Sequence, residues 1–431
     1  MNTKPIVLIL AGGKGSRFRS RMPKALHPIL GKPMAALVLD AVRALRPSRT
    51  FAVVGDRREE FARSFAGAGL ELIRQKEDLG TGGAVFSARH ALALEAERDV
   101  LVVPSNMPLL TGPTLKALLR THRKRGYSVT VLCAPGAPLE IPLAGSAGAV
   151  CAFKARDLLK ALSKLRRQGG RPFPLSDVVR LLSGSGRSGV CRARKAGELF
   201  EVGTRYDLAL AAAFLRVRKI RALALKGVSF LDPSSTWIDL DVRVGEETVI
   251  HPAVIIEGNS RIGRDCRVHP FVHIRNARIG HRVRIFGPTD IEDCTLEDDS
   301  RAGPFSRLRA KTVVKPGARV GNFVEMKNTV FGPRSRALHL SYLGDSEVGE
   351  DVNVGAGTIT CNYDGVRKNR TTIGDGVFIG SGTELVAPVK VGKKAYVAAG
   401  STITKDVAPE ALAVARARQI EIPGWVRRKK R

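Results

Sequence analysis

Short apolar runs alternate with helical patterns through the first half of the chain. Pro5 to Leu10 (PIVLIL), Phe51 to Val54 and Val100 to Val103 have the composition of buried strands. Apolar residues recur at helical spacing over Met34 to Leu45 and Glu59 to Phe65. This alternation predicts βαβ units around a mainly parallel sheet, and the ligands of such sheets bind at the carboxyl ends of the strands.

Two polar segments directly follow strands of this predicted sheet. Gly12 to Arg17 comes after the first strand, and Pro104 to Asn106 comes after the strand at Val100 to Val103. We therefore expect both segments on the same edge of the sheet. Further along, Asp207 to Leu225 has apolar residues at helical spacing with several arginines between them, which predicts one long connecting helix.

After Trp237 the pattern changes to a repeat of six residues. An aliphatic residue is closely followed by glycine in each unit, as in RIGRDC, RVGNFV, TIGDGV, FIGSGT and KVGKKA. This is the pattern of a parallel β-helix, in which aliphatic side chains stack in columns and glycine permits the corners. Residues 240–408 would supply about nine triangular coils, at roughly three units a coil.

The stretch CNYDGVRKNR, residues 361–370, interrupts the repeat with polar and charged residues. We expect it to project from the coil wall, either as part of a functional site or as a tolerated insertion. The whole chain divides into four predicted parts. Residues 1–206 form an α/β domain, 207–227 a linker helix, 228–410 the β-helix and 411–431 a basic tail.

Composition narrows the classes of function. No apolar run is long enough for a membrane span, and six scattered cysteines without CxxC spacing fit neither a zinc site nor a disulfide framework. We predict a cytoplasmic protein with free thiols. The net charge of +31 favours phosphorylated ligands, but the basic cluster at Arg427 to Arg431 lacks interleaved aromatics, so we do not expect a nucleic-acid partner.

The segment LAGGKGSRFRSRMPKALHP, residues 10–28, is the first candidate for chemistry. Its glycines let a triphosphate approach the backbone, and Arg17 and Lys24 add positive charge. The segment matches neither a Walker motif nor a dinucleotide fingerprint, because Lys14 precedes Gly15 and Phe18 stands in place of a third glycine. A generic glycine turn remains the alternative.

Several motifs together resemble those of the bifunctional GlmU-type enzymes: GGKGSRF with a following PK, QKEDLGTGGA, GPFSRLR, GNFVEMK, HLSYLGD and GAGTITCNYDG. The resemblance covers nearly the whole chain and is closer in the second half. It implies a Mg-dependent uridylyltransferase domain that acts on N-acetylglucosamine-1-phosphate. It also implies a homotrimeric left-handed β-helix domain that acetylates glucosamine-1-phosphate in UDP-N-acetylglucosamine biosynthesis.

The resemblance assigns roles in the second half residue by residue. His339 matches the general base, although Leu338 stands where the family usually has glycine. The positions that hold the sugar phosphate match Arg309, Lys327, Tyr342 and Asn353. The positions that bind acetyl-CoA match Ala356, Asn362, Tyr363, Ser381, Ala399 and Arg416.

Acetyl transfer to an amino sugar needs these residue types. A neutral imidazole can accept the proton that the amine carries in water, and two cations can fix a dianionic phosphate. Backbone N–H groups of the GAG turn at 355–357 can stabilise the oxyanion. A lone histidine in a repeat would otherwise be interpreted as a surface residue.

The first half departs from the family pattern at its metal positions. Asn106 replaces the Mg-binding aspartate, and Thr204 falls at the second ligand, usually an asparagine. A sugar-binding loop with its glutamate is missing between residues 132 and 149, where Ser146 replaces a further asparagine. The nucleotide-binding positions that remain, which we interpret as vestigial, are Leu10, Gly12, Gly13, Arg17, Lys24, Gln75, Gly80 and Thr81.

An amide oxygen can coordinate Mg²⁺ but brings no negative charge, so Asn106 would leave the ion dependent on the triphosphate alone. We therefore expect a retired uridylyltransferase that keeps its fold, so that Mg²⁺ is a cofactor only if this site still works and acetyl-CoA is the co-substrate of the chain. The alternative is that the family's metal position falls elsewhere across the gap and another carboxylate, such as Asp99, serves the metal.

Three functions remain open. We prefer an acetyl-CoA-dependent N-acetyltransferase acting on glucosamine-1-phosphate or a close amino-sugar phosphate. The second is a fully bifunctional enzyme that also uses UTP and Mg²⁺. The third is a non-catalytic basic scaffold that binds polyanions, and the presence of His339, Arg309 and Lys327 argues against it.

Overall fold

The computed structural model describes residues 4–13, 15–77, 79–136, 149–167, 172–184 and 186–429. The chain separates into two compact units, Met1–Leu215 and Arg216–Arg431, which we call the front unit and the rear unit. The boundary falls inside helix α8 (Arg205–Ala224). The four-part division drawn from the sequence stays a prediction. No helix in the described segments combines the length and the apolar character of a bilayer crossing.

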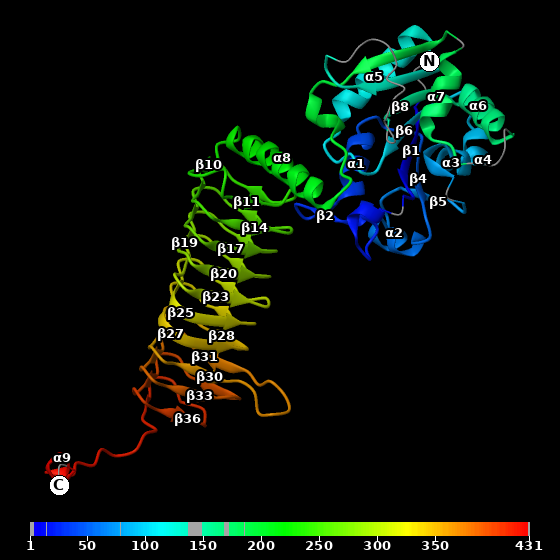
Figure 1. Cartoon of the computed structure of the whole chain (residues 1–431). Coiled ribbons are helices and arrows are strands. Elements are labelled where there is room, and N and C mark those ends of the chain that lie inside the picture. The colour runs from blue at the N-terminus through cyan, green and yellow to red at the C-terminus, as the bar shows by residue number, and fades with distance from the viewer. Residues whose placement is uncertain are drawn as a thin grey trace. The chain divides into compact units, whose positions relative to one another are not determined.

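The front unit is built around a seven-stranded sheet with the order β5-β4-β1-β6-β8-β7-β9 (Figure 1). Its neighbours are parallel except where β8 pairs with β6 and β7, so the predicted mainly parallel sheet is confirmed. The strands are β1 (Ile6–Ala11), β4 (Arg49–Val54), β5 (Glu71–Arg74), β6 (Asp99–Pro104), β7 (Val129–Cys133), β8 (Cys151–Lys154) and β9 (Ser188–Arg192). A small antiparallel pair is formed by β2 (Pro28–Ile29) and β3 (Lys32–Pro33).

Helices lie on both faces of this sheet and bury two apolar clusters against it. The strands β1 and β6 are buried on both faces, which explains their continuous apolar sequence. The helices of this unit are α1 (Met34–Arg43), α2 (Arg58–Ser64), α3 (Gly80–Ser87), α4 (Arg89–Ala93), α5 (Gly112–Arg125), α6 (Ala155–Arg167) and α7 (Leu175–Ser183). Short 3₁₀ turns are η1 (Ser16–Phe18), η2 (Lys24–Leu26) and η3 (Ala196–Leu199).

The rear unit is a left-handed parallel β-helix, as predicted, with three faces of short parallel strands (Figure 1). One face is a separate sheet of nine strands in the described chain: β12 (Arg243–Val244), β15 (Arg261–Ile262), β18 (Arg278–Ile279), β21 (Thr295–Leu296), β24 (Val313–Val314), β26 (Val330–Phe331), β28 (Ser346–Val348), β31 (Thr371–Ile373) and β34 (Val389–Val391).

The other two faces form one continuous sheet, because strands such as β25 and β27 run around the corner between them. Its strands are β10 (Ser229–Phe230), β11 (Trp237–Ile238), β13 (Val249–Ile250), β14 (Ile255–Glu257), β16 (Arg267–Val268), β17 (Val272–Arg275), β19 (Arg284–Ile285), β20 (Thr289–Glu292), β22 (Arg301–Ala302), β23 (Ser306–Arg309), β25 (Arg319–Lys327), β27 (Arg336–Gly344), β29 (Asn353–Val354), β30 (Ile359–Cys361), β32 (Phe378–Ile379), β33 (Glu384–Val386), β35 (Tyr396–Val397), β36 (Thr402–Ile403) and β37 (Leu412–Ala413).

Stacked side chains fill the interior of the coils. Along the nine-stranded face the register places successive aliphatic or aromatic residues directly above one another and buries them: Ile262, Ile279, Leu296, Val314, Phe331, Val348, Ile373 and Val391. Each coil shields the apolar residue of its neighbour, so the repeat read in the sequence is the repeat of the core.

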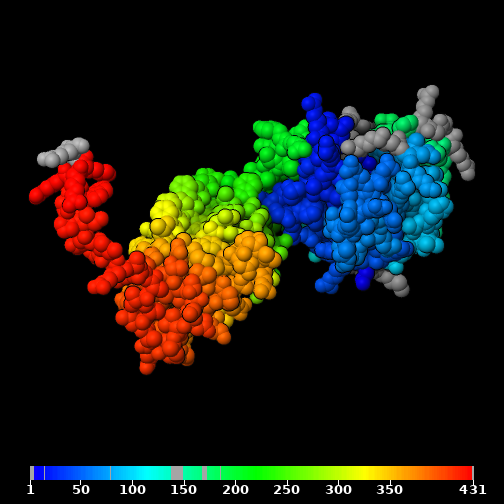
Figure 2. Space-filling model, turned by 90° about the horizontal axis from the view of Figure 1, so that it is seen from below, coloured from blue at the N-terminus to red at the C-terminus, as the bar shows by residue number. Residues whose placement is uncertain are grey.

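Two segments leave the coil wall. Residues 362–370 form an excursion between β30 and β31 that is exposed over residues 363–368 and closed by an antiparallel bridge between Tyr363 and Lys368 (Figure 1). The chain from Arg416 onward is exposed and ends in a short helix, α9 (Trp425–Arg428), shown in red in Figure 2. The repeat therefore ends near β37.

Candidate functional site

The front unit has a pocket of about 220 Å³ at the carboxyl ends of β1 and β6. The two ends are joined by a hydrogen bond from the Ser105 amide to the Leu10 carbonyl (2.9 Å), so the glycine turn and Asn106 share one edge, as expected. All but one of the predicted nucleotide-binding residues line this pocket: Leu10, Gly12, Gly13, Lys24, Gln75, Gly80 and Thr81. The exception, Arg17, is exposed and lies beside Gly203.

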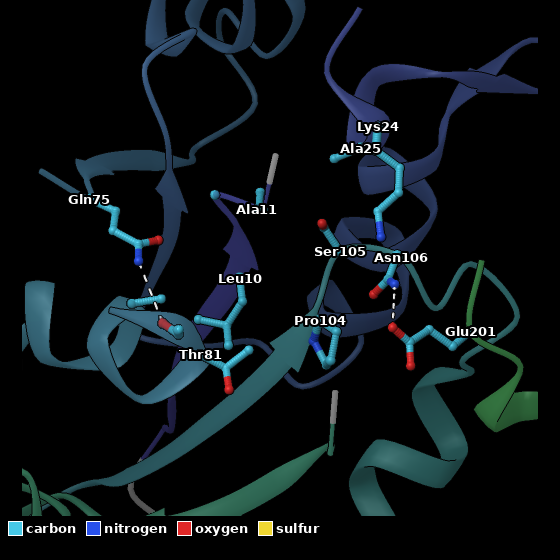
Figure 3. Close-up of a pocket in the computed structure, with 14 residues that line it drawn as sticks. Leu10, Ala11, Lys24, Ala25, Gln75, Thr81, Pro104, Ser105, Asn106 and Glu201 are labelled. Atoms are coloured by element: carbon cyan, nitrogen blue, oxygen red, sulfur yellow. Dashed lines mark hydrogen bonds between the residues drawn. The ribbon is translucent and has the colours of Figure 1, made fainter. Parts of the chain in front are cut away.

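Close packing in this pocket explains one of its glycines. A Cβ at Gly12 would come within 2.6 Å of Gln75 Oε1, so only glycine lets the Gln75 side chain reach the turn. The Gln75 amide also points back to the Gly80 carbonyl, at 3.5 Å, where α3 begins (Figure 3). Turn, strand end and helix start thus enclose one cavity.

Asn106 is buried, and its amide is fully engaged as a donor. Nδ2 donates to Glu201 Oε1 at 2.8 Å and to the Val202 carbonyl at 3.2 Å (Figure 3). Glu201 lines the same pocket, and it was missed by the reading of the sequence. The pocket therefore contains one carboxylate, although Asn106 itself brings none, and the effect of Asn106 on metal binding stays a prediction. The signal was available in EVGT, where Glu201 stands three residues before Thr204.

Thr204 serves as the N-terminal cap of α8. Its hydroxyl and its amide both donate to Asp207 Oδ2 at 2.8 Å, and the Asp207 amide donates back to its hydroxyl at 3.1 Å. This reciprocal pair is a capping box. The Thr204 hydroxyl bonds hold the pKa of Asp207 below its ordinary value, with help from the Gly203 amide. The hydrogen bonds of the Thr204 and Asp207 side chains are therefore used to cap α8.

Asp99 cannot replace the carboxylate missing at position 106. It begins β6, at the opposite end of the strand from the pocket, and roughly 23 Å of extended chain separates the two residues. Its carboxylate is buried between Lys154 Nζ and Arg123 Nε, both at 2.6 Å. Those two cations lower the pKa of Asp99 although burial opposes them. The alternative of Asp99 as the metal ligand is wrong.

The predicted departure from the family at Ser146 cannot be placed in the fold. Residues 137–148, including Ser146, are outside the described residues. Within the described segments, no group of three or more His, Cys, Asp or Glu side chains is placed to hold a metal ion. A nucleotide-bound Mg²⁺ requires only one or two carboxylates beside phosphate oxygens, and the Glu201 carboxylate on the pocket wall fits that requirement.

In the rear unit, a cluster of cations forms around Lys327. The register pairs Arg309 with Lys327 on adjacent coils. The Arg309 guanidinium is held by Glu325 Oε1 through Nε (2.8 Å) and Nη2 (2.6 Å). The approach of the Lys368 side chain, followed by burial, lowers the pKa of Lys327, while Asp345 opposes this. Arg309 and Lys327 are therefore neighbours on adjacent coils, and the Lys368 side chain approaches Lys327.

Lys368 was missed as a site residue. It belongs to the excursion 361–370, which was flagged as a place for function, but the sequence does not reveal which of its residues returns to the wall. The bridge to Tyr363 and the hydrogen bond from the Asn369 amide to the Asn362 carbonyl (2.7 Å) fold it back. Asn362 is buried and donates to Asp345 Oδ2 at 2.5 Å, next to the Tyr342 hydroxyl.

His339 lies on the other side of a corner from this cation cluster. Its strand partner is Asn322, whereas Lys327 pairs with Gly344. The backbone turns at Leu340, which has a positive φ. Five residues separate the two register positions, at most roughly 17 Å of chain. The His339 side chain is exposed within one chain.

The acetyl-CoA positions continue the His339 column. The strand register, which pairs Arg336 with Asn353, places Ala356 beneath His339 on the next coil. The Gly382 amide donates a hydrogen bond to the Ala356 carbonyl (2.7 Å), and the Gly400 amide donates one to the Ser381 carbonyl (2.8 Å). Arg416 Nη1 donates to the Ala399 carbonyl at 2.7 Å. The structure thus brings together four predicted residues below His339: Ala356, Ser381, Ala399 and Arg416.

The residues at the corner beside this column change from bulky to small at the coil that carries His339. Above it the corner residues are bulky and exposed, with Phe305 and Phe323 rings stacked at 5.1 Å, followed by Leu340. Below it the corner residues are Gly357, Gly382 and Gly400, all with positive φ. The small residues leave the wall open on three successive coils.

The remaining predicted residues divide between the two groups. Tyr342 and Asn362 belong with the cation cluster, because the Tyr342 hydroxyl and the Asn362 amide approach Gly344 together. Tyr363 is exposed on the excursion, and its hydroxyl donates to the Gly365 carbonyl at 2.6 Å. Asn353 belongs to neither group, because its strand partner on the preceding coil is Arg336, outside both the His339 column and the cation cluster.

Comparison with known proteins agrees with both units. A family model described as "MobA-like NTP transferase domain" matches residues 7–180, and one described as "Bacterial transferase hexapeptide (six repeats)" matches residues 241–276 and 370–405. The fold and the pocket therefore define a nucleotidyltransferase-like unit followed by a hexapeptide-repeat transferase unit.

Curated relatives named "Bifunctional protein GlmU" match the chain over nearly its full length. The protein of Pelobacter propionicus is 40% identical and covers 98% of both chains. That of Thermodesulfovibrio yellowstonii is 36% identical over 99% of both, and that of Thermotoga maritima is 38% identical over 98% of this chain and 99% of its own. The chain belongs to the GlmU family.

Proposed function

We propose that the rear unit transfers the acetyl group of acetyl-CoA to the amine of glucosamine-1-phosphate. The observation that carries the proposal is the pairing of an anion-binding cluster, Arg309, Lys327 and Lys368, with an exposed imidazole above a small-residue corner. Full-length similarity to GlmU proteins supports the same activity.

The chemistry assigns each group a task. The His339 imidazole takes a proton from the acceptor ammonium, and the freed nitrogen attacks the thioester carbonyl. The new C–N bond gives a tetrahedral oxyanion, and its collapse breaks the C–S bond. The nitrogen loses its second proton and the leaving sulfur gains one, so the coenzyme leaves as its thiol. The cations fix the phosphate of the acceptor. In the 355–357 turn, the Gly355 and Gly357 amides already donate to the carbonyls of Ile379 (2.8 Å) and Leu340 (2.6 Å), so the oxyanion donor expected from this turn narrows to the Ala356 amide.

We propose further that the two groups of one site come from different copies of the chain. The amine and phosphate of the acceptor sit on adjacent carbons, yet His339 and Lys327 flank a corner within one chain. The bulky residues on that corner are unusually exposed: Phe305 is 52%, Phe323 59% and Leu340 63% accessible. Contact between copies would bury them and place one copy's imidazole beside another copy's cations. The predicted homotrimer supplies such copies, and it stays a prediction, as does the cytoplasmic location.

A second candidate activity is uridylyl transfer by the front unit. The pocket at the ends of β1 and β6 favours it, because glycines, Lys24 and a carboxylate line one cavity. Similarity to proteins named bifunctional supports it as well. The expected loss of this activity rested on Asn106, Thr204 and the missing sugar-binding loop, and it stays a prediction. UTP-dependent release of pyrophosphate in the presence of Mg²⁺ would contradict that loss.

The test of acetyl transfer uses the full chain. Thiol release from acetyl-CoA is measured with and without glucosamine-1-phosphate. We expect release that depends on the amino sugar and saturates with it. Equal release in both samples, or none in either, would contradict the proposal.

A further inference from the structure

The side chains around Asn106 are arranged about a carboxylate. Glu201 is exposed on the pocket wall, and Asn106 Nδ2 donates to its Oε1 at 2.8 Å. Because the same Nδ2 also donates to the Val202 carbonyl, the buried amide ties the segment before α8 to the end of β6. Figure 3 shows the second Glu201 oxygen outside this hydrogen bond.

The charges around the pocket leave Glu201 as its anionic group. Lys24 points toward Asn106 in Figure 3, and burial lowers the pKa of Lys24 while Glu201 opposes this. Asp207 also raises the pKa of Lys24, but its carboxylate caps α8 through Gly203 and Thr204. Among the described residues that line the pocket, Glu201 is the one carboxylate.

We propose that Glu201 is the protein carboxylate that binds the divalent cation accompanying the nucleotide, and that Asn106 positions it. Mg²⁺ requires oxygen ligands, and one anionic protein oxygen beside phosphate oxygens is sufficient. The charge absent from position 106 is thereby supplied from position 201. Asn106 acts through its hydrogen bond, which orients the Glu201 carboxylate toward the cavity. The inference rests on the proposed binding of a nucleotide in this pocket.

The competing role for Glu201 is that of a counter-ion to Lys24. Such a role would stabilise the neighbouring cation without contributing to metal affinity. The two roles separate when metal binding is measured directly rather than through turnover.

The experiment uses the full chain, saturating UTP and Mn²⁺, with free Mn²⁺ followed by electron paramagnetic resonance. Four proteins are compared: the unmodified chain, Glu201→Gln, the double variant Asn106→Asp with Glu201→Gln, and Glu59→Gln. Glu59 is exposed on α2 and does not line the pocket, so it is a matched loss of one carboxylate. Circular dichroism confirms that each variant is folded.

We expect Glu201→Gln to weaken Mn²⁺ binding by at least about ten-fold. The double variant moves the carboxylate back to position 106, and we expect it to recover most of the affinity. Glu59→Gln should bind like the unmodified chain. Unchanged Mn²⁺ affinity in Glu201→Gln would overturn the inference, and so would a double variant as weak as the single one.

UTP binding in EDTA, followed by calorimetry, separates the inference from the proposal on which it rests. If the unmodified chain binds no UTP with or without Mn²⁺, the nucleotide pocket and the inference both fail. If UTP binds and Glu201→Gln still holds Mn²⁺ normally, only the role of Glu201 fails.

Discussion

The front pocket and the rear corner place their residues by different means. In the rear unit one register offset fixes the column, so Ala356 lies below His339 because each coil repeats the one before it. In the front unit the pocket gathers Lys24, Gln75 and Glu201 from segments with no common period. A repeat makes the neighbours of a residue predictable, whereas an irregular pocket can replace a lost group from a distant segment.

The two regions also differ in how charge is held. The rear cluster brings Arg309, Lys327 and Lys368 together, with Glu325 paired to Arg309, so positive charge is in excess there. The front pocket sets a carboxylate beside a half-buried ammonium, which leaves room for both a phosphate and a cation. The difference matches the two activities proposed above, acyl transfer in the rear unit and nucleotide chemistry in the front unit.

The largest effect is expected at His339. His339→Ala removes the general base and should slow thiol release from acetyl-CoA by about 100- to 10,000-fold. UTP binding by the front unit should not change. The control His90→Ala removes an exposed histidine from α4 and should retain full release. A His339 variant with undiminished release would show that another group takes the proton.

The next effect concerns the excursion. Lys368→Gln removes one of the three clustered cations, so the KM for glucosamine-1-phosphate should rise about 10- to 100-fold with a smaller change in kcat. Arg370→Gln is the matched control, since Arg370 is exposed on the same segment and faces Glu347 at 3.5 Å. Steady-state kinetics measure both. Equal behaviour of the two variants would remove Lys368 from the site.

The third effect distinguishes the two units by pH. His122 is fully buried in the front unit, bonded to Thr130 at 2.9 Å, and burial lowers its pKa to about 4. The unfolded chain takes up this proton near pH 6.5, so unfolded chains bind more protons between pH 6.5 and 4. Stability of the front unit should fall by about 2–4 kcal/mol as the pH drops through that window.

Calorimetric unfolding at a series of pH values tests this. His122→Gln should flatten the dependence over the same window, because an amide does not titrate. A front-unit transition that is constant from neutral pH to pH 4 would contradict the assignment.

The smallest effect is expected on the outer surface of the rear unit. Arginines stack on five successive coils there, in register and exposed: Arg267, Arg284, Arg301, Arg319 and Arg336. Like charges in neighbouring strands repel by a few tenths of a kcal/mol each. Arg301→Gln should therefore stabilise the rear unit slightly at low salt, as judged by urea unfolding. The control Arg282→Gln should not, because Arg282 pairs with Asp299 at 2.7 Å. Equal changes in the free energy of unfolding for the two variants would show that repulsion between the stacked arginines does not lower stability.

Features that follow from the spacing of residues along the chain could be predicted from the sequence. Features that depend on contacts between distant segments could not. The β-helix followed from the spacing of residues such as Ile262 and Ile279, because the stacking of coils is encoded in each unit. The front strands followed from continuous apolar runs. Glu201 and Lys368 were missed because their roles depend on where a loop returns, and Asp99 was misjudged because strand direction sends it to the opposite edge.

Mixing two inactive variants tests the central claim most directly. His339→Ala and Lys327→Ala each lack one group of the site, and the two chains are co-expressed and assayed for glucosamine-1-phosphate-dependent thiol release. If one copy supplies the imidazole and another the cations, random assembly leaves about a quarter of the sites intact, and activity should return to about that share. If both groups of a site belonged to one chain, every site would be defective and the mixture would stay inactive, which would contradict the account.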